Sequence, residues 1–213
     1  MKSKQPQTQE IILYPEEFLR RKAAKVKEVN DTIKTLAQRM VITLLNNGGA
    51  GLAAPQVGYS ARIIIMNLTG ISTDNSCFIN PEILDRDEEM VSMPERCLSI
   101  PKVRGMVSRP KRIVIKFTNI EGKELVTELT GWGARVMQHE IDHLDGVLFV
   151  DHLKGVQKTM AANKLKKIRK SVERRQKAEK KIFDREQAKQ ISRLSKRARE
   201  EIAAEDEVKA LNP

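Results

Sequence analysis

The uneven distribution of charge sets the strongest limit on how this chain folds. Residues 154–199 contain 18 Lys and Arg against 4 Asp and Glu, whereas residues 1–153 contain 20 against 19. A segment with a net charge of +14 is far more polar than an ordinary core-forming segment. The sequence therefore predicts a domain over residues 1–153 and a basic helical extension over residues 154–213.

Size and composition are those of a small enzyme. The 213 residues include 40% apolar side chains, enough for one real core plus an appendage. The first ten residues are polar, and no apolar run approaches the roughly 18 residues that span a bilayer. We therefore expect a cytoplasmic protein with no membrane partner. Two cysteines, Cys77 and Cys97, are too few for a disulfide framework.

The first half of the chain reads as a helix followed by a strand. Apolar residues recur at helical spacing after Asn30 and Asp31, which predicts a helix over about 31–46 with a cap at its start. The glycine-rich stretch GGAGLAAPQVG then breaks the helix, and ARIIIMN, residues 61–67, reads as a strand.

The second half reads as short strands and a further helix. FINPEIL and CLSI, residues 78–84 and 97–100, are candidate short strands bounded by prolines. Alternation on both sides of Glu121 and Gly122 predicts a hairpin over 112–129. Thr130 is placed to cap a helix that runs to about Asp145 and stops at Gly146.

The basic extension reads as one long helix. It lacks glycine after Gly155 and lacks proline until Pro213. An apolar stripe predicts docking of its first part on the domain, through Leu153, Val156, Met160, Leu165, Ile168 and Val172. Over residues 173–181 apolar residues become sparse, so we expect the distal half to lie in solvent. A weak stripe then restarts, which suits a second helix or a partner surface: Ile182, Ile191, Leu194, Ala198 and Ile202.

The stretch VMQHEIDHLDG carries the chemistry of the chain. His139 and His143 lie four residues apart on one helical face, so both imidazoles can reach one metal ion. Glu140 is then placed to take and return a proton while the metal lowers the pKa of water. Two histidines on a helix can also be plain core or surface residues.

The third metal ligand does not follow from this motif. Phe149 stands where one class of zinc peptidase has a histidine, and His152 comes three residues too late. The nearest downstream glutamate, Glu173, lies in the basic segment. Upstream, Cys97 offers a thiolate that would leave one coordination position open.

Three motifs taken together resemble those of peptide deformylases: GAGLAAPQ at 49–56, ERCLS at 95–99 and QHEIDH at 138–143. The similarity extends over most of residues 12–153. It implies an α+β fold in which small antiparallel sheets surround a central metal-binding helix, followed here by a long basic C-terminal helix. It also implies a metal-dependent hydrolase that removes the N-formyl group from the initiator methionine of nascent polypeptides.

The resemblance assigns roles to residues of this chain. It gives Cys97, His139 and His143 as the metal ligands and Glu140 as the general acid and base. Gln56 and the backbone N–H of Leu98 correspond to the donors that stabilise the oxyanion. The family's metal is usually Fe²⁺, one per chain, although a thiolate and two imidazoles also suit Ni²⁺, Co²⁺ or Zn²⁺.

Several further residues are candidates for substrate binding. Gly49 and Gly51 would let the backbone pair with an extended peptide. Trp132 and Val136 precede His139 on nearly the same helical face and are candidates for a methionine pocket or for core packing. Arg104 is a candidate for the flank of the peptide channel.

Two carboxylates are candidates for contacts that support the metal ligands, and one residue departs from the usual motif of the family. Glu95 and Asp142 are candidate carboxylates that pair with Arg109 behind the ligands. Arg96 replaces the glycine that is usual before the metal-binding cysteine, so it would line or narrow the route of the peptide.

The extension resembles the basic helix with which related bacterial enzymes dock on the ribosome near the tunnel exit. A ribosome or RNA contact would use the phosphate backbone. Its candidate residues are Lys164, Lys166, Lys167, Arg169, Lys170, Arg174 and Arg175.

A monomer is expected. Three alternatives stay open: a catalytically altered deformylase-like protein that acts mainly through ribosome or RNA binding, a hydrolase of a different N-acyl peptide, and a zinc peptidase.

Overall fold

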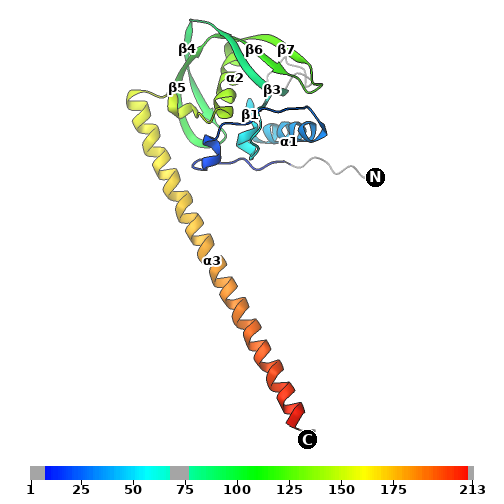
Figure 1. Cartoon of the computed structure of the whole chain (residues 1–213). Helices are drawn as coiled ribbons and strands as arrows, with labels where there is room; N and C mark the ends of the chain where they lie inside the picture. The colour runs from blue at the N-terminus through cyan, green and yellow to red at the C-terminus, as the bar shows by residue number, and fades with distance from the viewer. Residues whose placement is uncertain (1–7, 68–76, 211–213) are drawn as a thin grey trace. The chain divides into compact units, whose positions relative to one another are not determined.

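The computed structural model describes residues 8–67 and 77–210 (Figure 1). The chain divides into two compact units, Met1–Lys166 and Lys167–Pro213. This division falls inside the last helix, α3 (Gly155–Ala210). Among the described residues, no helix combines the length and the apolar character needed to cross a bilayer.

Two antiparallel sheets form the first unit. The larger sheet has the strand order β1-β2-β3-β6-β7 and the smaller one pairs β4 with β5. The strands are β1 (Gly51–Ala53), β2 (Ile63–Met66), β3 (Cys77–Arg86), β4 (Met90–Cys97), β5 (Ile100–Pro110), β6 (Arg112–Thr118) and β7 (Glu124–Thr130). Strand β1 is an edge strand, since β2 is the only neighbour that the described sheet gives it. The predicted strand over 61–67 and the predicted hairpin over 112–129 are confirmed as β2 and β6–β7.

Two helices cover the two faces of the larger sheet. They are α1 (Asp31–Asn47) and α2 (Gly131–Leu144), accompanied by the short 3-10 helices η1 (Glu17–Arg20), η2 (Ala54–Val57) and η4 (Phe149–His152). Ile63 and Ile65 of β2 pack with α1, whereas Ile64 and Met66 pack with α2. Successive strand residues point to opposite faces, so an uninterrupted apolar run fits a strand that is buried on both sides. The α+β architecture is thus confirmed, with α2 at its centre (Figure 1).

Residues at the ends of α1 and α2 explain most of the positions at which these helices begin and end. The Asn30 side chain accepts a hydrogen bond from the Ile33 N–H at 3.1 Å, and α1 ends at Gly48 with φ 63°. Thr130 precedes α2 as predicted, but its side chain makes no capping hydrogen bond, so that part of the prediction is wrong. Gly146 has φ 75°, and a Cβ atom there would collide with the backbone of Arg20. Only glycine suits both conditions.

The predicted short strand over residues 97–100 is wrong. Strand β4 ends at Cys97, Leu98 and Ser99 form a tight turn, and β5 begins at Ile100. The prolines misled the prediction: Pro94 lies inside β4 and Pro101 inside β5. A two-stranded sheet tolerates them because each strand has a free edge, where no backbone N–H is needed.

Helix α3 confirms the predicted long helix, but its predicted docking stripe is partly wrong. Leu153 and Ala161 are buried, whereas Val156 is 76% exposed and Met160 is 57% exposed. Val156 and Met160 lie about 140° and about 100° around the helix from Ala161, at 3.6 residues per turn. The buried face is therefore centred on Ala161.

Candidate metal centre

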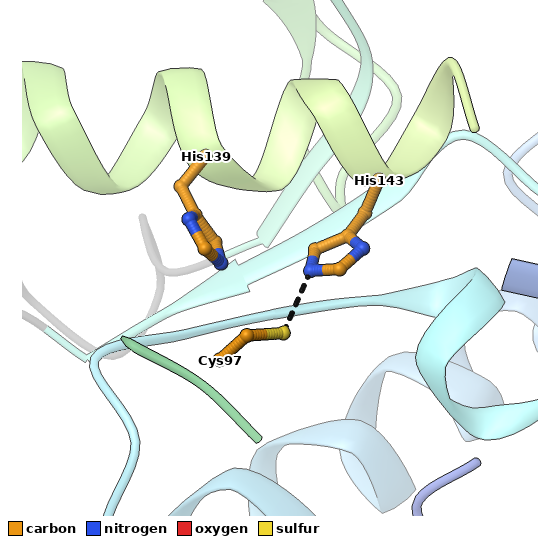
Figure 2. Close-up of side chains that lie close together, drawn as sticks. All are labelled: Cys97, His139 and His143. Carbon is orange, nitrogen blue, oxygen red and sulfur yellow. Dashed lines mark hydrogen bonds between the residues drawn. The ribbon is translucent and has the colours of Figure 1, made fainter. Parts of the chain in front are cut away.

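The structure brings Cys97, His139 and His143 together in the interior of the first unit (Figure 2). Both histidines project from α2, and Cys97 approaches them from the end of β4. The three ligand atoms lie within 4.8 Å of one another, and Sγ of Cys97 is 3.1 Å from Nε2 of His143. All three side chains are buried. The cluster could hold one metal ion.

The donor chemistry of the cluster fits a divalent transition metal. Burial by itself would raise the pKa of the Cys97 thiol, but the charge of His143 and hydrogen bonds with both imidazoles lower it well below its usual range. The thiolate, which is the ligating form, is thereby favoured. A thiolate and two imidazoles suit iron, zinc, nickel or cobalt ions.

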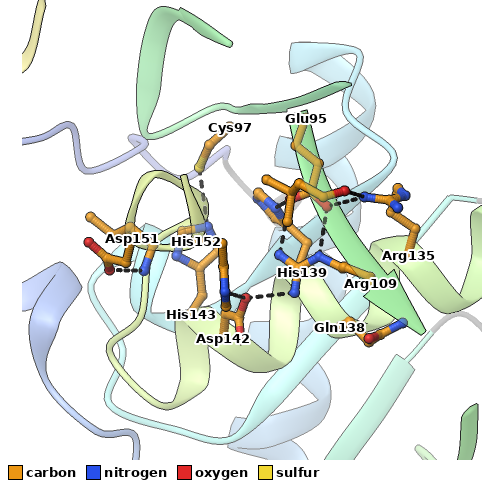
Figure 3. Close-up of polar contacts among 12 residues, drawn as sticks. Glu95, Cys97, Arg109, Arg135, Gln138, His139, Asp142, His143, Asp151 and His152 are labelled. Carbon is orange, nitrogen blue, oxygen red and sulfur yellow. Dashed lines mark hydrogen bonds and ion pairs between the residues drawn. The ribbon is translucent and has the colours of Figure 1, made fainter. Parts of the chain in front are cut away.

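Glu95 fixes the orientation of His139 (Figure 3). Its carboxylate accepts a hydrogen bond from Nδ1 of His139 at 2.9 Å, which leaves Nε2 as the ring atom available to a metal. The same carboxylate accepts hydrogen bonds from Arg109 at 2.7 Å and from Arg135 at 2.6 Å. The predicted pairing of Glu95 with Arg109 is confirmed. The part played by Arg135 was missed, although its position one turn before His139 was a usable signal.

The ionised form of Glu95 is strongly favoured by this network. Burial opposes ionisation, but hydrogen bonds from His139 and Arg109 together with their charges hold the pKa of Glu95 far below its usual range. Asp142 completes the network: it accepts hydrogen bonds from Arg109 at 2.8 Å and from His152 at 2.7 Å. Arg109 is thus held between the carboxylates of Glu95 and Asp142, behind the candidate metal ligands, and the predicted pairing of Asp142 with Arg109 is confirmed.

Glu140 lies in the cluster with one oxygen free. It is buried, and within the described part of the chain its Oε2 atom has no hydrogen-bond partner. Burial raises the pKa of Glu140. A Cβ atom at Gly51 would lie 2.6 Å from Oε1 of Glu140 and 2.8 Å from Cγ1 of Val136. Glycine at position 51 therefore makes the space that the carboxylate occupies.

Gln56 points its amide nitrogen into the same space. Its Oε1 atom accepts a hydrogen bond from the Ala53 N–H at 2.8 Å, which fixes the side chain. Its Nε2 atom then lies 3.6 Å from Sγ of Cys97 and 3.3 Å from Oγ of Ser99. Leu98 follows Cys97 in the turn between β4 and β5. A fixed amide donor thus stands beside the candidate metal ligands.

The remaining candidate residues are not part of the metal-ligand cluster. Val136 is buried and contacts the position of Gly51, whereas Trp132 is 51% exposed. Arg96 and Arg104 are both exposed on the β4–β5 hairpin. The seven basic candidates of the extension are exposed along α3: Lys164, Lys166, Lys167, Arg169, Lys170, Arg174 and Arg175.

Comparisons with known proteins agree on one family. The family model described as Polypeptide deformylase matches residues 8–159. A peptide deformylase from Thermodesulfovibrio yellowstonii is 40% identical over 159 residues, which cover 74% of this chain and 96% of the relative. One from Wolbachia sp. subsp. Brugia malayi is 38% identical over 174 residues, which cover 77% of this chain and 97% of the relative. Most of α3 lies beyond the matched family region.

Solved structures give the same result. The peptide deformylase of Thermotoga maritima superposes with a TM-score of 0.66 at 38% identity and covers 70% of this chain and 99% of its own. That of Ehrlichia chaffeensis in complex with actinonin superposes with a TM-score of 0.71 at 34% identity, with 78% and 98% covered. With the family match, these relatives and the arrangement of the cluster, the chain belongs to the polypeptide deformylase family, the hydrolases that remove the N-formyl group from the initiator methionine of nascent polypeptides.

Proposed function

We propose that Cys97, His139 and His143 hold one divalent metal ion per chain and that Glu140 is the general acid and base of deformylation. The observation that carries this proposal is the convergence of three ligand atoms within 4.8 Å beside a buried carboxylate with a free oxygen. Bound there, a divalent ion supplies Lewis acidity toward the formyl carbonyl and lowers the pKa of water.

The residues of the chain then carry the proton and the developing charge. Glu140 accepts a proton from the attacking water and delivers it to the leaving amine nitrogen, so that formate and a free amino terminus result. The amide of Gln56 and the backbone N–H of Leu98 donate hydrogen bonds to the formyl oxygen as negative charge develops on it. Donors that are already oriented in a buried site stabilise that charge without reorganisation.

The peptide part of the substrate is proposed to bind as an added strand. Strand β1 is at the edge of the larger sheet, so the outer edge of Gly51 is open to pairing with an extended chain. Gly49 lies in the loop before β1. Val136, beside Gly51, and Trp132, one turn earlier on α2, are the proposed wall of the pocket for the methionine side chain.

Release of formate from formyl-Met-Ala-Ser by iron-loaded protein under anaerobic conditions tests the chemistry. Glu140→Ala should lower turnover by at least about 100-fold while the protein keeps one metal ion per chain, because only proton transfer is removed. Cys97→Ala should lose both turnover and the metal. Asp85→Asn, at an exposed ion pair with Arg112, serves as the matched surface control. Turnover by Glu140→Ala equal to that of the unaltered chain would overturn the assignment.

The proposed metal is Fe²⁺, with Ni²⁺, Co²⁺ and Zn²⁺ as ions that the same ligands accept. An iron site with a thiolate ligand is sensitive to oxygen, whereas a nickel site is not. Turnover of iron-loaded protein should therefore decay in air while turnover of nickel-loaded protein persists. Equal survival of both forms would contradict iron as the working metal.

The proposed location is the cytoplasm, where formylated chains are made, with the enzyme acting as a monomer.

The extension over residues 154–213 is proposed to contact the ribosome near the tunnel exit, with residues 1–153 as the catalytic domain. Its support is the charge of +14 over residues 154–199, carried in part by the seven exposed basic residues named above. Phe183 is its single aromatic residue, so contacts to RNA would be made with phosphates rather than by base stacking.

Deletion of residues 176–213 tests this contact. It should leave hydrolysis of a short formyl-peptide unchanged and weaken co-sedimentation with ribosomes at moderate salt. A full-length variant with glutamine at Lys166, Lys170 and Arg174 separates loss of charge from loss of length. If both altered chains co-sediment as the unaltered chain does, the ribosome proposal is wrong.

A further inference from the structure

The β4–β5 hairpin that supplies Cys97 carries only positive charge on its exposed side. Five charged residues lie between Met90 and Pro110: Glu95, Arg96, Lys102, Arg104 and Arg109. Glu95 and Arg109 are buried and pair with each other at 2.7 Å. The other three are exposed cations. The exposed side of this hairpin is therefore electropositive.

Arg96 and Arg104 lie on the same face of this hairpin. In β4 Glu95 and Cys97 are buried while Arg96 between them is exposed. In β5 the exposed Arg104 precedes the buried Gly105, which is paired in register with Glu95. Side chains alternate between the faces of a strand. Both guanidinium groups therefore extend from the outward face, on residues that adjoin the Glu95–Gly105 pair on the side of the hairpin turn.

Neither guanidinium group forms an ion pair with a carboxylate in the described part of the chain. The nearest carboxylate in sequence, that of Glu95, pairs instead with Arg109 and Arg135. Neighbouring like charges on a sheet repel each other. A carboxylate placed between them would relieve this repulsion, and the planar fork of arginine suits bidentate contact with a carboxylate.

The position of the hairpin connects these charges with the substrate. Arg96 directly precedes Cys97. The next residue, Leu98, lies against the loop before β1, since a Cβ atom at Gly49 would be 3.0 Å from its Cδ1 atom. The peptide that is proposed to pair with β1 would therefore leave the metal site along this hairpin.

We propose that Arg96 and Arg104 select formylated chains that carry an aspartate or glutamate within the first few residues after the methionine. This inference rests on the proposed deformylase chemistry and adds a substrate class to it. An acidic segment of the nascent chain is favoured over RNA as the partner because Arg96 adjoins a metal ligand, where the substrate must come.

Three peptides with the same backbone test the inference. Formyl-Met-Ala-Asp, formyl-Met-Ala-Ser and formyl-Met-Ala-Lys are compared by kcat/KM, and a second set moves the charged residue one position farther from the methionine. The unaltered chain should prefer the acidic to the basic peptide by about three- to tenfold in at least one set, as expected for contacts between exposed charges. The preference should shrink at about 0.5 M salt, where such contacts are screened.

Four variants of the full chain separate charge from shape. Arg96→Gly and Arg104→Gln should each lower the ratio of kcat/KM between the acidic and the basic peptide, and Arg96→Lys should keep most of it. Lys27→Gln removes an exposed cation from another part of the chain and should leave the ratio unchanged.

Equal kcat/KM for the acidic and basic peptides in both sets, with robust turnover of formyl-Met-Ala-Ser, would overturn the inference while the deformylase proposal stands. Lack of turnover with every peptide would instead mark failure of the proposed chemistry, and the inference would fall with it. A ratio that Arg96→Gly and Arg104→Gln leave unchanged would also overturn it, and weaker ribosome co-sedimentation of those variants would then identify RNA as the partner.

Discussion

The carboxylate of Glu95 lies 2.9 Å from Nδ1 of His139 and joins the smaller sheet to α2. It also holds Arg109 and Arg135, whose side chains are buried. One carboxylate thereby orients a candidate metal ligand and pairs with two buried guanidinium groups, of which Arg109 has Asp142 as its second partner. The site is supported by charge balance as well as by apolar packing, and this balance has consequences for stability.

Glu95→Ala should destabilise the metal-free protein by about 3–5 kcal/mol, because it leaves two buried guanidinium groups without their shared partner. Urea unfolding followed by circular dichroism measures the change. Asp85→Asn, which breaks an exposed ion pair with Arg112, should change the free energy of unfolding little and serves as control. An equally small change for Glu95→Ala would show that the network contributes nothing.

The contribution of Glu95 should depend on pH in a defined direction. Hydrogen bonds from His139 and Arg109 hold the pKa of Glu95 below its unfolded value, in spite of burial. Its contribution is therefore fully present above the unfolded pKa of about 4.3 and is lost as the pH falls toward the folded pKa. The difference in unfolding free energy between the unaltered chain and Glu95→Gln should narrow between about pH 7 and about pH 3. A difference that stays constant over this range would contradict the assignment.

Gly51→Ala should impair turnover more than it impairs folding. The added methyl group would lie 2.6 Å from Oε1 of Glu140, so the carboxylate must move from its position beside the metal ligands. Overpacking of this kind costs about 1–3 kcal/mol of stability. Gly49→Ala is the matched comparison, since its methyl group would meet the flexible ends of Leu44 and Leu98. We expect kcat on formyl-Met-Ala-Ser to fall further for Gly51→Ala than for Gly49→Ala, and the reverse order would refute this account.

The two cysteines should differ sharply in reactivity. Burial, with a smaller effect from the charge of Glu121, raises the pKa of Cys77 to about 12, whereas the pKa of Cys97 is lowered. Native metal-free protein at about pH 8 should therefore be alkylated by iodoacetamide at Cys97 and not at Cys77.

Mass spectrometry of the alkylated protein checks this prediction. Reloading with metal should protect Cys97, and Cys97→Ala should take up no label until it is denatured. Labelling of Cys77 in the native chain, or unchanged labelling of Cys97 after metal is added, would count against the assigned environments.

Local sequence patterns were enough to determine the helices and the chemistry on one helical face. Spacing of four residues placed His139 and His143 together because a helical turn brings such residues onto one side. The cap at Asn30 and the apolar periodicity after it predicted α1 almost to the residue. These features depend on neighbours within a few positions along the chain, so the sequence by itself was sufficient.

Only the tertiary structure decided how Cys97 and Glu95 meet α2. Glu95 and Arg135 are 40 residues apart, and Glu95 and His139 are 44 apart. The short turn at Leu98 and Ser99, which brings Cys97 to the histidines, was predicted as part of a strand. The buried face of α3 also differed from the predicted apolar stripe, since Val156 and Met160 are exposed. Contacts between distant segments depend on how whole elements pack, and local periodicity carries no information about which partner an exposed or buried face will meet.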